Sequence, residues 1–309
     1  MSPRIPVQLP VLALLLACCL LYSTTSAQRP EARLETMTYK RVGGRELQVD
    51  VFWPPAMSND VSESSDSALP HFRRPAIAFF HGGGWVGGDR SVYHEACRRY
   101  ADRGFVTCTF QYRLSRNEDG TYPHPEITPV ESVQDARSAL RWMRRRADTL
   151  GIDPQRIAAW GRSAGGQLVL ATAICDGIDD PRDNRTISPV PNALLTFSAC
   201  YNTVQTWCDR MLGEKRDRIW DISPHHGLTA NLPPSIGFHG LKDTTEPVRV
   251  ARWFQAKART LGCPFELVIL KDQGHHLAGG GDLPGEIEND VIMKRVDAFL
   301  RQTGLMPVE

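Results

Sequence analysis

The sequence predicts an α/β fold in which helices cover both faces of a mainly parallel β-sheet. Short apolar runs alternate with amphipathic stretches through most of the 309 residues, and this alternation is typical of repeated strand–helix–strand units. Two of the apolar runs end directly in glycine-rich turns, as strands do when their carboxyl ends carry a functional loop. The length favours one large domain, because two domains would need a linker and none is visible.

The expected elements can be placed in chain order. Strands are expected where short runs are apolar, β-branched or aromatic, at residues 75–80, 105–112, 157–160, 193–197, 235–239 and 265–270. Helices are expected where apolar residues recur at helical spacing, at residues 92–103, 129–150, 167–174 and 248–261, and in a final stretch that carries Ile292, Val296, Phe299 and Leu300 and ends before Gly304. Most pairs of successive strands are therefore joined by a helix.

The helix at 129–150 has the clearest boundaries. Thr128 and Glu131 have the spacing of a capping box, in which each side chain bonds to the backbone N–H of the other residue. Pro129 suits the first helical position, and Gly151 suits the position after the last turn.

The most informative feature is a pair of glycine-rich segments, His81-Gly82-Gly83-Gly84-Trp85 and Gly161-Arg162-Ser163-Ala164-Gly165. Serine is a weak nucleophile unless a sharp strand-to-helix turn exposes its hydroxyl, and flanking glycines let the backbone fold tightly around it. Three successive glycines after a strand leave backbone N–H groups free to bind the oxyanion of a tetrahedral intermediate. Together the two segments predict an acyl-transfer site with Ser163 as the nucleophile.

A serine nucleophile needs a base, and the base needs an acid that orients it. In this kind of site the acid and then the histidine follow the serine in the chain, each on a loop after a strand. Asp243 follows one predicted strand, with Glu246 and Asp272 as rival acids, and the pair His275 and His276 follows the last predicted strand. The residues alone leave open which histidine acts.

The remaining histidines have simpler explanations. His81 is expected to support the glycine loop through hydrogen bonds. Four others lie in irregular polar stretches and are given no role, namely His71, His124, His225 and His226.

Two stretches break the alternation of strands and helices. Residues 58–71 are rich in Ser and Asp and predict a solvent-exposed loop. Residues 198–233 carry aromatic residues, cysteines, prolines and a histidine pair without a clear period. Their position after a central strand predicts a small cap or insertion over the site. Cys200 and Cys208 close the shortest loop among the later cysteines, so a disulfide between them and a pair of buried thiols are both open.

Five motifs occur in an informative combination. They are His81-Gly82-Gly83-Gly84-Trp85, Tyr112-Arg113-Leu114, Gly151-Ile152-Asp153-Pro154-Gln155-Arg156-Ile157, Gly161-Arg162-Ser163-Ala164-Gly165-Gly166 and His239-Gly240-Leu241-Lys242-Asp243. The combination resembles the α/β-hydrolase esterases of the hormone-sensitive-lipase type and of the acetyl or feruloyl esterase type. It spans roughly residues 35–303 and implies the α/β-hydrolase fold.

The resemblance also implies roles for single residues. Ser163 is the nucleophile, Asp243 the acid and His275 the base, because the histidine of that family directly follows a glycine, as His275 follows Gly274. The oxyanion donors implied by the resemblance are the backbone N–H groups of Gly83, Gly84 and Ala164. An aromatic residue often stands two positions after the base in that family, and this chain has Leu277 there.

The function implied by the resemblance is hydrolysis of short-chain or polysaccharide-linked acyl esters through an acyl-enzyme, with no metal or organic cofactor. Three other functions stay open on the same motifs. An arylformamidase would hydrolyse an N-formyl amide inside the cell, and a serine peptidase of the prolyl-oligopeptidase kind would need a large domain ahead of the first core strand. A non-catalytic binding protein would not need a candidate for every catalytic role.

The first residues are typical of an export signal. Arg4 gives a positive start, residues 9–21 are almost wholly apolar, and Thr25-Ser26-Ala27 offers a cleavage site before Gln28. We therefore expect residues 1–27 to be a signal peptide that is removed.

The mature chain, residues 28–309, would be secreted or periplasmic and would contain no membrane span. A lipid anchor is the alternative, because Leu15-Leu16-Ala17-Cys18 resembles a lipid-attachment box. Loss of Arg4 would change the formal net charge from +1 to zero. Neither nucleic acid nor an anionic membrane surface is then expected as the main partner, because both attract a basic excess.

Overall fold

The computed structural model of the chain describes residues 31–55, 73–205, 207–277 and 284–306. The predicted signal peptide at 1–27, with Cys18, and the predicted loop at 58–71, with His71, lie outside the described residues. Within the described ranges, no helix combines the length and the apolar character needed to cross a membrane.

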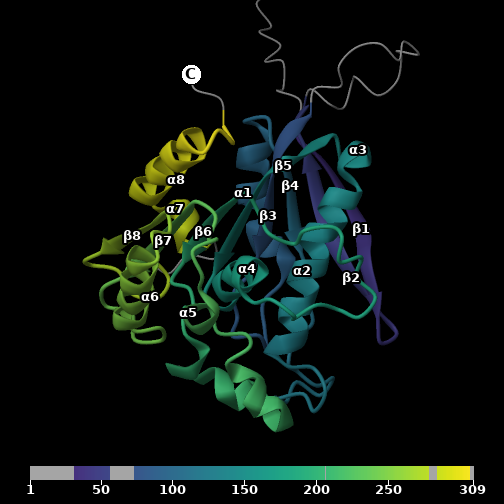
Figure 1. The fold of residues 1–309 in the computed structure, drawn as a ribbon. Coiled ribbons are helices and arrows are strands. Elements are labelled where there is room, and N and C mark those ends of the chain that lie inside the picture. The colour runs from purple at the N-terminus through teal and green to yellow at the C-terminus, as the bar shows by residue number, and fades with distance from the viewer. Residues whose placement is uncertain (1–30, 56–72, 206, 278–283, 307–309) are drawn as a thin grey trace, which may run out of the picture. The chain divides into compact units, whose positions relative to one another are not determined.

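Eight strands of the described residues form one sheet, which is mainly parallel as the sequence predicted (Figure 1). The strands are β1 (Arg33–Val42), β2 (Arg45–Trp53), β3 (Arg74–Phe80), β4 (Val106–Phe110), β5 (Ile152–Arg162), β6 (Ala193–Phe197), β7 (Ser235–Gly240) and β8 (Phe265–Leu270). Their order across the sheet is β1-β2-β4-β3-β5-β6-β7-β8. β2 is antiparallel to both β1 and β4, and the other neighbours are parallel. The loops that leave the parallel strands therefore share one edge of the sheet.

Helices cover both faces of the sheet (Figure 1). The longer helices are α1 (His94–Ala101), α2 (Pro129–Arg145), α4 (Ala164–Ile174), α6 (Val248–Thr260) and α8 (Asp290–Gln302), and the single-turn helices are α3 (Ala147–Leu150), α5 (Pro224–Gly227) and α7 (Gly285–Glu288). In β3, Ala78 and Phe80 join the core formed with α2, α4 and α6, whereas Ile77 and Phe79 join the core formed with α1 and α8. This alternation is what a strand buried on both faces requires.

The helix predicted at 129–150 begins as expected but is interrupted near its end. Thr128 Oγ1 accepts a hydrogen bond from the first turn at 3.3 Å, and the Glu131 carboxylate accepts the Thr128 N–H at 2.8 Å, so the capping box is present. The chain leaves helical geometry at Arg146, where φ is −98° and ψ is 13°. α3 then supplies the last turn before Gly151, whose φ of 68° ends it.

The sequence prediction did not place β1 and β2, and the predicted starts of β5 and α4 were wrong. β1 and β2 form an antiparallel pair at the edge of the sheet, and much of β1 is exposed, so no apolar run marks it. β5 begins at Ile152, ahead of the run predicted at 157–160, because Arg74 of β3 pairs with Ile152 before a register shift. α4 begins at Ala164 rather than at Gln167. The small residues of its first turn gave no apolar signal, so the prediction started the helix too late.

Residues 198–233, which we call the β6–β7 insertion, lie between these two strands and are green in Figure 1. The insertion contains α5 and three 3₁₀ helices, at Thr203–Gln205, Trp207–Met211 and Gly213–Ile219. Cys200 and Cys208 are separate buried thiols, so the disulfide considered from the sequence is not formed.

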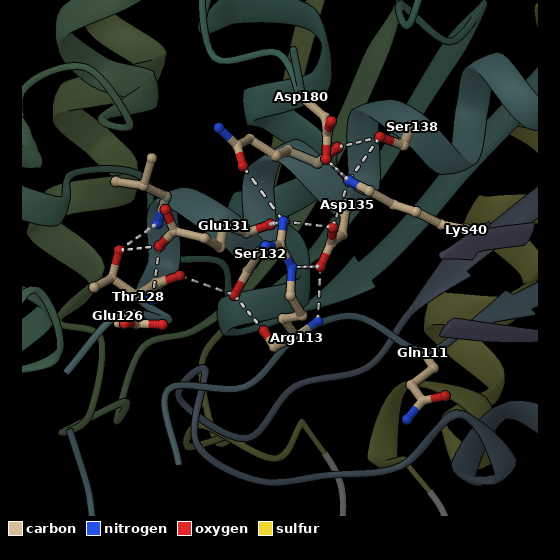
Figure 2. Close-up of polar contacts among 12 residues, drawn as sticks. Lys40, Gln111, Arg113, Glu126, Thr128, Glu131, Ser132, Asp135, Ser138 and Asp180 are labelled. Carbon is tan, nitrogen blue, oxygen red and sulfur yellow. Dashed lines mark hydrogen bonds and ion pairs between the residues drawn. The ribbon is translucent and has the colours of Figure 1, made fainter. Parts of the chain in front are cut away.

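A buried network of charges joins β1 to α2 (Figure 2). Asp135 is fully buried, and its carboxylate accepts hydrogen bonds from Lys40 Nζ at 2.7 Å and from two Arg113 nitrogens at 2.8 Å each. Lys40 Nζ also lies 3.0 Å from Asp180 Oδ2. Opposite charges at hydrogen-bond distance offset the cost of removing each group from water. Because Arg113 directly follows Tyr112, the network also fixes the chain next to the site described below.

Candidate active site

Ser163 occupies the sharp turn between β5 and α4. Its backbone has φ 54° and ψ −122°, a region that residues other than glycine rarely adopt, and its N–H donates to Phe197 O at 2.9 Å. A Cβ at Gly161 would lie 2.3 Å from Gly165 O, and one at Gly165 would lie 2.1 Å from Phe80 O. Glycine is therefore required at both positions, because the turn leaves no room for a side chain.

His275 links this serine to an acid through its two ring nitrogens. Its Nε2 lies 3.0 Å from Ser163 Oγ, and its Nδ1 lies 2.8 Å from Asp243 Oδ2. The three side chains come from the loops after β5, β7 and β8, which share one edge of the sheet. This arrangement lets an imidazole take the serine proton while its other nitrogen donates to the carboxylate.

The adjacent His276 lies differently. Its ring centroid is 5.7 Å from that of His275, and the two planes are 78° apart. In the described part of the chain, no hydrogen bond joins His276 to Ser163 or Asp243. Burial, followed by the charge of Arg162, lowers the pKa of His276, so the ring is mostly neutral at pH 7.

Asp243 is held by donors on both of its carboxylate oxygens. Oδ1 accepts the backbone N–H groups of Thr245 at 2.9 Å and Glu246 at 2.8 Å. Oδ2 accepts from His275 and lies 3.3 Å from His239 Nε2. Burial acts to raise the pKa of Asp243, but the hydrogen bonds from His239 and His275 outweigh it and hold the pKa well below its ordinary value. The carboxylate therefore stays ionised at neutral pH.

His239 was given no role from the sequence, and Glu246 only that of a rival acid. His239 is fully buried, and its Nε2 donates to Glu246 O at 2.7 Å. Burial, followed by the charge of Asp243, raises the pKa of the Glu246 carboxyl to about 8, so this buried group is mostly protonated at pH 7. The other rival acid, Asp272, is exposed and lies 3.3 Å from Lys242 Nζ. Neither rival carboxyl is hydrogen-bonded to the base among the described contacts.

The glycine loop after β3 runs beside the serine. A Cβ at Gly82 would lie 3.4 Å from Ser163 Cβ. Gly83 and Gly84 have φ values of 117° and 60°, which favour glycine. No described residue accepts the N–H groups of Gly83, Gly84 or Ala164. Those donors are therefore available to a carbonyl oxygen bound at the serine.

His81 supports this loop through hydrogen bonds, as the sequence predicted. Its Nδ1 donates to Gly82 O at 2.8 Å, and its ring stacks on Tyr112 with centroids 4.3 Å apart. The Tyr112 hydroxyl donates to His81 O at 2.8 Å. Burial lowers the pKa of His81 to about 4, so the ring is neutral at pH 7 and adds no charge beside the serine.

A separate surface hollow of about 590 Å³ lies beside the buried charge network of Figure 2. Its lining includes Arg113, Glu131 and Asp180 and none of the three residues joined through His275. The hollow is therefore distinct from the site at Ser163.

Comparisons with known proteins agree with this fold. The BD-FAE family model matches residues 68–257, which is more than half of the chain. The solved structure of Thermogutta terrifontis esterase 2 phosphorylated by paraoxon is 30% identical and has a TM-score of 0.73. That match covers 91% of this chain and 98% of the esterase chain.

Two curated proteins of Mycobacterium tuberculosis are also similar. Carboxylesterase NlhH is 31% identical over 45% of this chain and 37% of its own length. Esterase LipC is 27% identical over 67% of this chain and 53% of its own length. The matches thus span about half or less of these two curated relatives. From the family match and the fold, the chain belongs to the BD-FAE family, within the esterases of the α/β-hydrolase fold.

Proposed function

We propose that this chain hydrolyses carboxylic esters through an acyl-enzyme formed on Ser163. The observation that carries the proposal is the hydrogen-bonded series from Ser163 Oγ through the His275 ring to the Asp243 carboxylate, at 3.0 Å and 2.8 Å. Similarity to proteins named carboxylesterase and esterase supports the same reaction. In this proposal Ser163 is the nucleophile, His275 the base and Asp243 the acid that orients the base.

The reaction follows from the geometry of these groups. His275 Nε2 takes the hydroxyl proton as Ser163 Oγ attacks the ester carbonyl, and Asp243 stabilises the imidazolium that forms. The imidazolium then gives its proton to the alcohol, which departs. The acyl group stays bonded to Ser163 Oγ. A water molecule repeats the two steps in the same site and releases the acid.

The carbonyl oxygen carries a full negative charge in the tetrahedral intermediate. We assign its stabilisation to the N–H groups of Gly83, Gly84 and Ala164, because none of them has another acceptor among the described residues. A single donor of this kind contributes about 3 to 4 kcal/mol to the transition state. The largest part of the rate enhancement is therefore expected from this loop and the base together.

Short acyl groups are the proposed substrates. Solved structures of Thermogutta terrifontis esterase 2 are described as propionate bound and butyrate bound, which favours short acids. Polysaccharide-linked acetyl or aromatic acyl esters stay within the proposal, because the motif resemblance includes esterases of that kind.

The test is a panel of initial rates with the purified chain and a Ser163→Ala variant. The panel contains nitrophenyl acetate, butyrate and decanoate, acetylated xylan, methyl ferulate and N-formylkynurenine. The proposal expects hydrolysis of the short esters by the wild type and none by the variant. Turnover of N-formylkynurenine alone would identify an arylformamidase instead, and no turnover of any ester would overturn the proposal.

We also propose that the protein is exported and cleaved before Gln28, on the pattern of residues 1–27. N-terminal sequencing of protein recovered from the export compartment tests this. A start near Gln28 supports cleavage, a lipid-modified Cys18 supports the tethered alternative, and an intact Met1 contradicts both.

A further inference from the structure

Trp207 of the β6–β7 insertion lies directly on the loop that carries Gly84. A Cβ at Gly84 would lie 2.3 Å from Trp207 Cη2, and 3.2 Å and 3.3 Å from the adjacent ring carbons Cζ2 and Cζ3. The Trp207 ring also meets the Trp85 ring edge-on, with centroids 5.8 Å apart and planes at 63°. The indole is therefore in van der Waals contact with the backbone whose N–H groups we assign to the oxyanion.

The backbone around Trp207 is fastened to the rest of the domain. Cys208, the next residue, is fully buried, and Met211 O at the end of the same 3₁₀ helix accepts the Ser115 hydroxyl at 3.2 Å. Trp207 itself is only half-buried. Trp207 thus keeps some exposed surface, while its neighbours hold the backbone in place.

A second contact fixes the insertion to the helix that follows the serine. Gln167 of α4 accepts the Trp85 indole N–H at 3.1 Å and donates to Ile222 O of the insertion at 2.8 Å. One side chain therefore ties together the glycine loop, α4 and the insertion. A rigid aromatic side chain held beside a reacting carbonyl has the geometry of a pocket wall.

The sheet order indicates which part of the ester this wall contacts. His275 must give a proton to the leaving alcohol, so the alcohol lies towards the loop after β8. Gly84 lies in the loop after β3, where Trp207 contacts it from the β6–β7 insertion, and β3 and β8 are on opposite sides of β5 in the sheet. An acyl group that extends away from the leaving alcohol would point to the side of Gly84 and Trp207.

We propose that Trp207 closes the acyl side of the pocket and restricts the acyl group to short chains. The proposal rests on the ester hydrolysis proposed above and adds the residue that selects the acid. An indole occupies space that the outer methylene groups of a longer acyl chain would need, and a packed site accommodates such extra groups poorly. Truncation of Trp207 should open that space without touching the groups that transfer protons.

The test compares Trp207→Ala and Trp207→Phe with the matched control Trp220→Ala. Trp220 lies just after the last 3₁₀ helix of the insertion, is 54% exposed and packs edge-on against His226 instead of the glycine loop. We expect Trp207→Ala to raise the ratio of kcat/KM for nitrophenyl octanoate to that for nitrophenyl acetate by about 10- to 100-fold. Trp207→Phe should raise it by a smaller factor, and Trp220→Ala should leave it unchanged.

An unchanged ratio in folded Trp207→Ala, or in Trp207→Phe where the alanine variant does not fold, overturns the assignment. A changed preference among methyl, butyl and benzyl butyrate, with the acyl ratio constant, would move Trp207 to the alcohol side and overturns it equally. The wild type separates the two proposals. Ester hydrolysis by the wild type, with acyl ratios unchanged in the Trp207 variants, contradicts only the role of Trp207. No ester hydrolysis by the wild type contradicts both proposals.

Discussion

Asp135 and Asp243 have fully buried carboxylates, and each is held by two nitrogen-bearing side chains. The partners of Asp135 are the cationic side chains of Lys40 and Arg113 (Figure 2). The nearest side-chain partner of Asp243 is the imidazole of His275, whose other ring nitrogen lies 3.0 Å from Ser163 Oγ. A buried aspartate can therefore either stabilise the fold, as at Asp135, or serve the proposed reaction, as at Asp243. The side chains that surround it determine which.

The difference between their partners separates an acid that holds the fold together from one that takes part in the proposed reaction. The network around Asp135 pairs its carboxylate with Lys40 and Arg113, and it joins β1 to α2. Asp243 accepts from the imidazole that lies 3.0 Å from Ser163 Oγ, so in the proposed reaction the imidazolium forms beside a carboxylate. Removal of Asp135 should therefore reduce stability, and removal of the groups around Asp243 should reduce turnover.

The largest expected effect is at the serine. Ser163→Ala should lower kcat by about 10⁵- to 10⁶-fold, because a triad without its nucleophile keeps only the contribution of the oxyanion donors and binding. The melting temperature should stay close to that of the wild type, since the hydroxyl contributes little packing. Fluorophosphonate labelling followed by peptide mass mapping checks the assignment, and an adduct on any other residue would falsify it.

The histidine pair gives the next largest effect. His275→Ala should approach the loss of Ser163→Ala, because the only imidazole hydrogen-bonded to both Ser163 and Asp243 among the described residues is removed. His276→Ala should retain most activity, because no hydrogen bond among the described residues joins its ring to Ser163 or Asp243. Steady-state kinetics on purified, folded variants decide between them. The reverse ranking would transfer the base role to His276.

The two buried acids then give a direct comparison. Asp135→Ala leaves Arg113 without its carboxylate partner and Lys40 with Asp180 alone, and should lower the free energy of unfolding by about 3 to 5 kcal/mol, with kcat per folded molecule near that of the wild type. Asp243→Asn should instead lower kcat by about 10⁴-fold with a smaller loss of stability. Urea unfolding and kinetics on both variants check this. Equal losses of stability and activity in the two variants would remove the distinction.

Much of the fold could be predicted because its signals are local. The apolar runs that became β3, β4 and β6 to β8, and the caps around α2, depend on neighbouring residues in the chain. β1 escaped prediction because an edge strand with exposed polar side chains lacks an apolar run, whereas β2 alternates the buried residues Leu47, Val49 and Val51 with polar ones, a strand pattern that was overlooked. The start of β5 at Ile152 depends on pairing with Arg74, a partner that no local pattern reveals.

The candidate site could be selected only in part, for a similar reason. Ser163, Asp243 and His275 could be chosen because each directly follows a strand, and their catalytic roles stay predictions. The contact of His239 with Asp243 forms only because β7 ends in a turn that folds back on the strand. The protonated state of Glu246 depends on complete burial beside another carboxylate, which the sequence does not show.

The smallest expected effect concerns Glu246. It tests the contrast between Asp135 and Asp243 through the pH dependence of the free energy of unfolding. Burial, followed by the charge of Asp243, raises the pKa of Glu246 to about 8 in the folded chain, against about 4.3 when it is unfolded. Between these two values the folded state binds one proton more than the unfolded state, so its stability falls as pH rises and levels off above about pH 8.

Glu246→Gln keeps the shape of the neutral side chain but removes this titration. Its stability relative to the wild type should therefore increase from pH 5 to pH 9, by about 2 to 4 kcal/mol. Asp272→Asn is the matched control, because Asp272 has a side chain that is 88% exposed and should show no such trend. Urea unfolding at pH 5, 7 and 9 measures both. Parallel stability curves for Glu246→Gln and the wild type would mean that Glu246 is already ionised in the folded chain at pH 7. In that case a second charge lies beside Asp243, and the contrast with Asp135 would lose its basis.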